Sequence, residues 1–76
     1  MSDFWRSVTY KGFQGFIVAQ QKVNHRLTGV LVAFTVPKDD KVELERFKKT
    51  MEIYNDNVGR VVNRIIPLDE LDEKLS

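Results

Sequence analysis

The chain has 76 residues, with twelve Lys and Arg against eleven Asp and Glu, and no cysteine. That length makes one domain, residues 1–76, and the missing cysteine excludes disulfide staples. With a single histidine and no ligand cluster at metal spacing, we expect no metal and no cofactor. A domain this small buries only about 60% of its unfolded surface, so oligomerisation is the remaining way to supplement its core.

Two further exclusions concern location. No stretch approaches the ~20 apolar residues of a membrane span, and the N-terminus lacks the layout of a signal peptide. We therefore expect a cytoplasmic protein that does not enter a membrane.

Charge is distributed unevenly along the chain. Residues 1–38 hold five basic and one acidic side chain (5 − 1 = +4), and residues 39–76 hold seven basic and ten acidic ones (7 − 10 = −3). A dipolar chain of this kind could associate head to tail or present its basic half to an acidic partner.

The first half predicts a β-meander over residues 1–37. Val30–Val36 contains only one polar residue, which is typical of a strand covered on both faces. Residues 5–10 and Phe16–Val23 are also rich in strand-favouring side chains. We expect a small antiparallel sheet, a hairpin or a three-stranded meander, spanning about residues 5–36 and ended by Pro37.

The second half predicts a helix within residues 40–66. Asp40 and Glu43 have the spacing of a capping box at its start. Apolar residues then recur with alternating gaps of 3 and 4, as in a heptad series: Leu44, Phe47, Met51, Tyr54, Val58, Val61 and Ile65. This pattern favours one long or kinked helix over about residues 41–65, packed on the sheet in an α+β fold.

A competing interpretation breaks the helix at Asn55–Gly59, whose Asn, Asp and Gly are poor helix-interior residues. It has a helix over residues 41–55, a turn, and a strand over Arg60–Ile66. We favour the long helix because burial of its apolar seam would outweigh about 3–4 kcal/mol of lost propensity. Residues 68–76 form an acidic amphipathic tail or a short C-terminal helix.

No catalytic constellation is visible. His25 lies in a predicted loop beside Arg26, with no cysteine or orienting carboxylate nearby in the sequence. The acidic pairs fall at a helix start and in the tail, where acid has structural uses. We expect no enzyme, and we assign no catalytic, cofactor-binding or metal-binding residue.

Protein binding is the function that the pattern favours. One helix covers one face of the sheet, and a monomer rarely leaves a second apolar face in water. We expect a small non-enzymatic regulatory module, an adaptor or inhibitor of a larger protein, that acts as a homo-oligomer and most simply as a dimer. The heptad residues Leu44 to Ile65 are the candidate oligomer interface, and the sheet face or the acidic tail would dock the partner.

The alternative is a small single-stranded nucleic-acid-binding protein. Its basic, aromatic N-terminal half would supply cations beside stacking rings. The candidate contacts are Arg6, Lys11, Phe13, Lys22 and Arg26. A sequence pI of about 8.0 is low for a dedicated binder of polyanions.

Overall fold

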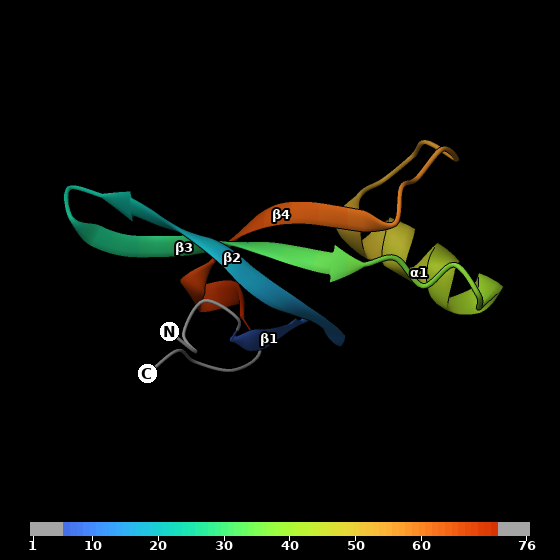
Figure 1. The fold of residues 1–76 in the computed structure, drawn as a ribbon, viewed down its shortest axis with the longest axis horizontal. Coiled ribbons are helices and arrows are strands. Elements are labelled where there is room, and N and C mark those ends of the chain that lie inside the picture. The colour runs from blue at the N-terminus through green and yellow to red at the C-terminus, as the bar shows by residue number, and fades with distance from the viewer. Residues whose placement is uncertain (1–5, 72–76) are drawn as a thin grey trace.

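The computed structural model describes residues 6–71. Its elements are, in order, β1 (Ser7–Tyr10), β2 (Phe13–Val23), β3 (Arg26–Thr35), α1 (Lys41–Met51), β4 (Val61–Pro67) and the 3-10 helix η2 (Leu68–Glu70) (Figure 1). The strands form one sheet in the order β1-β2-β3-β4, and each neighbouring pair is antiparallel. The predicted α+β fold, a small antiparallel sheet with one helix, is confirmed.

The helix is shorter than the heptad series predicts. It ends at Met51, where Glu52 takes a left-handed conformation (φ 58°, ψ 49°) and donates its N–H to the carbonyls of Lys48 and Lys49. The chain then returns as β4 and pairs with β3 from Thr35↔Val61 to Gly29↔Pro67. The continuous or kinked helix over residues 41–65 is therefore wrong, and the helix–turn–strand interpretation is confirmed in outline.

The physical reason is that the β-branched residues gain more hydrogen bonding and burial as a strand than as a continuation of the helix. As a strand, residues 61–67 gain backbone hydrogen bonds to β3 and bury Ile66, which is 3% exposed. As a helix they would extend an apolar seam that has no second helix to receive it among residues 6–71. Of the predicted C-terminal helix the structure shows the single turn η2, and residues 72–76 lie outside the described range.

The helix begins where the sequence predicts. Asp40 Oδ1 accepts the N–H groups of Val42 at 3.0 Å and Glu43 at 3.2 Å. The Glu43 carboxylate does not make the reciprocal bond of a capping box, because Arg46 donates to it from Nε at 2.8 Å and from Nη2 at 3.1 Å. These bonds from Arg46 lower the pKa of Glu43.

The buried side chains form one cluster, which includes residues of all four strands and α1. Phe47 of α1 makes edge-to-face contacts with Phe13 and Phe34, at ring-centroid distances of 5.1 and 6.3 Å. Leu68 and Leu71 pack on the same cluster. The helix and the chain after β4 therefore cover the same face of the sheet.

Gly15 lies inside β2, opposite Val8 of β1 and Phe34 of β3. A Cβ at this position would stand 2.5 Å from Val32 Cγ1 and 2.9 Å from the Ala33 carbonyl oxygen. Glycine is needed here for close approach within the sheet.

We predict that Gly15→Ala lowers the free energy of unfolding by roughly 1–3 kcal/mol, because the added methyl group must displace Val32 or the β3 backbone. Urea denaturation followed by circular dichroism measures the change. Gly59→Ala is the matched control, since a Cβ there meets nothing within 4 Å. Equal stability of the two variants would contradict the close packing around Gly15.

Candidate interaction surface

Strand alternation separates the sheet into a covered face and an open face. On the covered face, Val30, Val32 and Phe34 of β3 are completely buried. The open face has the strand residues of opposite alternation, and its central part consists of Ser7, Thr9, Gln14, Phe16, Val18, Leu31, Ala33, Thr35, Val61, Asn63 and Ile65. Its central row runs across all four strands as Ser7–Phe16–Ala33–Asn63.

The open face carries no charge. The charged residues in the four strands are Lys22 and Arg26, at the far end of the β2–β3 hairpin, and Arg64, whose alternation places it on the covered face opposite Val32. Charged residues make up 30% of the chain. At that frequency, roughly three of the open-face positions would be charged on an ordinary solvated surface.

Several apolar side chains of the open face are half in water. The exposed fractions are 48% for Phe16, 42% for Val18, 55% for Val61 and 54% for Ile65. A depression of about 310 Å³ lies over Phe16, Val18, Ala33, Thr35 and Val61. An antiparallel sheet with one solvated face normally shows polar side chains there, so this face has the chemistry of an interface.

The structure does not bring the predicted heptad residues into one seam. Leu44, Phe47 and Met51 lie on α1 and pack in the protein's own core, while Tyr54 and Val58 lie in the connection to β4. Val61 and Ile65 alone belong to the open face. The members that sequence reasoning left out are chiefly Phe16, Val18 and Ala33, although the apolar runs in β2 and β3 hold enough apolar side chains for both faces.

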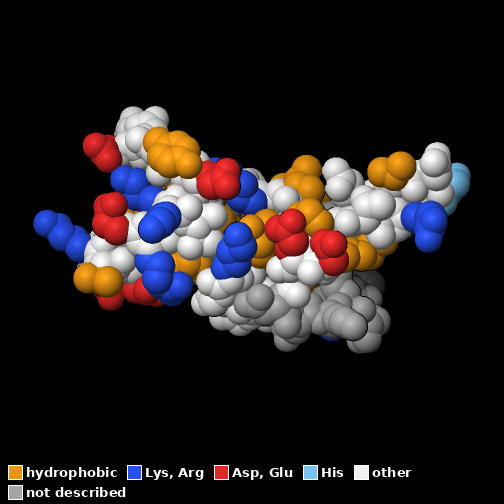
Figure 2. All heavy atoms as spheres, turned by 180° about the vertical axis from the view of Figure 1, so that it is seen from behind, with side chains coloured by type: hydrophobic (Ala, Val, Ile, Leu, Met, Phe, Trp, Pro, Cys, Tyr) orange, Lys and Arg blue, Asp and Glu red, His pale blue; other side chains and the backbone are white. Residues whose placement is uncertain are grey.

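The five nucleic-acid candidates do not share a surface either. Phe13 is 8% exposed and packs on Phe47. Lys11 lies in the β1–β2 turn. Lys22 lies nine strand residues beyond Phe13, which places it roughly 30 Å from Phe13. In Figure 2 the single histidine marks the hairpin end of the molecule, and basic and acidic side chains are interspersed over the opposite end, which holds α1.

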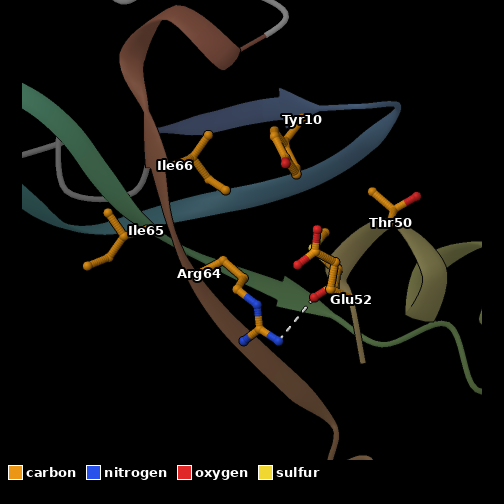
Figure 3. Close-up of a pocket in the computed structure, with 7 residues that line it drawn as sticks. Tyr10, Thr50, Glu52, Arg64, Ile65 and Ile66 are labelled. Atoms are coloured by element: carbon orange, nitrogen blue, oxygen red, sulfur yellow. Dashed lines mark hydrogen bonds between the residues drawn. The ribbon is translucent and has the colours of Figure 1, made fainter. Parts of the chain in front are cut away.

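A small hollow lies between the C-terminal end of α1 and strands β1 and β4 (Figure 3). Arg64 donates from Nη2 to the Met51 carbonyl at 3.2 Å and from Nη1 to the Asn63 carbonyl at 3.0 Å. A cation is favourable at this end of a helix, where carbonyls lack intrahelical partners. The volume of about 150 Å³ is below the roughly 300–1,000 Å³ of usual small-molecule pockets.

Within residues 6–71 no cluster of three His, Cys, Asp or Glu side chains could hold a metal ion. No helix in that range is long and apolar enough to cross a membrane. Comparison of the chain with protein-family models, curated proteins and solved structures gives no significant match. The function must therefore be inferred from the surface chemistry of the chain itself.

We predict that Phe34→Ala and Phe16→Ala differ sharply in stability. Phe34 is completely buried, so its truncation should cost about 3–5 kcal/mol. Phe16 is half exposed, and its truncation should cost less than about 1.5 kcal/mol. Chemical denaturation in dilute solution compares the two variants, and equal losses would contradict the division into covered and open faces.

Proposed function

We propose that the protein is a small non-enzymatic protein-binding module that acts as a homo-oligomer, as an adaptor or inhibitor of a larger protein would. The observation that carries this proposal is the uncharged open face of the sheet, with its half-exposed Phe16, Val18, Val61 and Ile65. Removing this apolar surface from water supplies a driving force for association.

A second copy of the chain is a suitable occupant for the open face. A two-fold axis brings identical surfaces together, and a face without charges meets no like-charge repulsion when it does so. Phe16, Val18, Val61 and Ile65 are each about half exposed, so a partner on this face would remove apolar surface from water. A standard interface buries roughly 800 Å² per partner. Two sheets stacked about 10 Å apart would enclose Phe16 between them.

We predict that Phe16→Lys converts the dimer to a monomer that stays folded, because the ammonium group would be forced into an apolar interface. Multi-angle light scattering at tens of micromolar measures the mass, and circular dichroism measures the fold. Val42→Lys is the control, since Val42 is 78% exposed on α1, away from the open face. A dimer that survives Phe16→Lys, or an unmodified protein that is monomeric, would refute this use of the face.

Single-stranded nucleic-acid binding is a second candidate, favoured by one feature. No acidic residue occurs between Asp3 and Asp39, and the exposed end of the β2–β3 hairpin carries Lys22, His25 and Arg26. A projecting basic ribbon of this kind suits phosphate contacts.

For this candidate we expect an oligothymidine to bind at low salt. Lys22→Glu with Arg26→Glu should weaken binding and reduce the slope of log K against log salt by roughly one to two. Fluorescence anisotropy measures both quantities, with Lys41→Glu on α1 as the control. If no binding is detectable at low salt, the candidate fails.

A further inference from the structure

The outer edge of β4 has backbone groups that bond to no other described strand. Val36, which lies opposite Arg60 in the register, donates its N–H to the Arg60 carbonyl at 2.9 Å. In an antiparallel ladder hydrogen-bonded pairs alternate with non-bonded ones, so Val62, Arg64 and Ile66 bond to β3. The N–H and C=O groups of Val61, Asn63 and Ile65 then point away from β3, and β4 ends the sheet of described strands.

This edge lacks two of the usual devices that prevent strand addition, lysine and a bulge, although Arg64 is an inward charge and Pro67 ends the strand. Natural edge strands are protected by lysines, bulges, inward charges or great shortness. β4 is seven residues long, pairs with β3 without a register shift, and has proline only at its last position. The edge is therefore bounded at one end by Pro67 and at the other by the connection from α1, which rises past the start of β4 in Figure 1.

A positive charge lies beside the edge. Arg64 Nη1 donates to the carbonyl of Asn63, one of the outward-pointing groups, so its guanidinium is held against the edge. Two of its five N–H groups are used in the bonds to Asn63 and Met51, which leaves others for an anion. Within residues 6–71 neither Arg64 nor Arg60 forms an ion pair, although Glu52 lines the same hollow as Arg64.

We propose that the free edge of β4 binds an extended, acidic segment of a partner protein, which adds to the sheet as a fifth strand. The inference rests on the proposed protein-binding function and names the chemistry of the partner. Backbone bonds to Val61, Asn63 and Ile65 supply the affinity, as in other cases of strand addition. Alternate side chains of the added strand supply the specificity.

The two sides of β4 dictate that alternation. On the covered side, the added strand passes Arg60, Val62 and Arg64, so carboxylates are favoured at the two positions beside the arginines. On the open side it passes Val61 and Ile65, which favour apolar residues at the positions between. A second copy of β4 fits poorly, because it would bring its own Arg60 and Arg64 beside the first pair and like charges across strands destabilise pairing.

The test uses a capped peptide of about seven residues in which Val and Glu alternate, added to the isotope-labelled full chain. Chemical shifts in ¹H–¹⁵N NMR spectra give the affinity, and hydrogen exchange gives the paired amides. We expect slower exchange at the amides of Val61, Asn63 and Ile65, which point outward, and little change at Val62 and Arg64, which already bond to β3. A peptide of alternating Val and Lys should bind at least tenfold more weakly.

Two variants sharpen the test. Asn63→Pro removes one outward N–H without touching the β3 ladder and should weaken binding about tenfold. Arg60→Glu should abolish the preference between the Glu and Lys peptides, since it cancels the charge of Arg64, and Arg60 is exposed and leaves the Arg64 bonds intact. The exchange measurement on the unmodified chain stands even if Asn63→Pro fails to fold.

The inference is overturned if no shift appears at millimolar peptide, if protection falls on other amides, or if both peptides bind equally. Phe16→Lys separates it from the proposed oligomer. A monomeric Phe16→Lys variant that still binds the Glu peptide supports both proposals. An intact dimer that ignores the peptide removes the edge site alone, and an unmodified monomer that binds it removes the oligomer alone.

Discussion

The structure depends on the antiparallel pairing of β3 with β4. This pairing adds the fourth strand, fixes where the chain leaves the sheet, and places η2 and Leu71 on the same face as α1. Because all the covering elements among residues 6–71 lie on one side, the other side keeps its apolar side chains in water. The open face is thus a consequence of topology as much as of composition.

Arg64 links two parts of this arrangement that are distant in sequence. Its guanidinium joins the last helical carbonyl of α1, at Met51, to the free edge of β4 at Asn63. The contact with Met51 spans thirteen residues along the chain. An arginine suits this position because it is always charged and its planar fork can serve several acceptors together. Lysine, with one compact ammonium group, would not reproduce both bonds.

Local chemistry made some parts of the fold predictable. The helix start follows from Asp40, and the sheet of the first half follows from Val30–Val36 and its neighbours. The heptad series led to the wrong prediction of a long helix. Its gaps of 3 and 4 occur by coincidence, because its residues lie in a helix, a connection and a strand. A strand of alternating residues repeats every second position, so Val61 and Ile65 satisfy both periods. Only the presence of β3 as a neighbour decides between them.

The open face was predictable in kind but not in its residues. An apolar second face follows from Phe16 and Val18, together with a third strand that is apolar on both sides. Which residues lie on this face could not be read from the sequence. That depends on the register of β4 against β3 and on the register shift in β2 between Ile17 and Ala19. The free edge of β4 follows from the order of the strands in the sheet, and amino-acid composition does not indicate that order.

The long connection between β3 and β4 also bears on the order of folding. The β1–β2–β3 meander is built from contacts between residues close in sequence, whereas β4 closes a loop of about 25 residues before it can pair. We expect the meander to form early and β4 to join late and detach first. In such a partly opened state the buried Val30, Val32 and Phe34 of β3 would lose one neighbour. β4 therefore completes the sheet and, because it detaches first, also limits the lifetime of the four-stranded sheet.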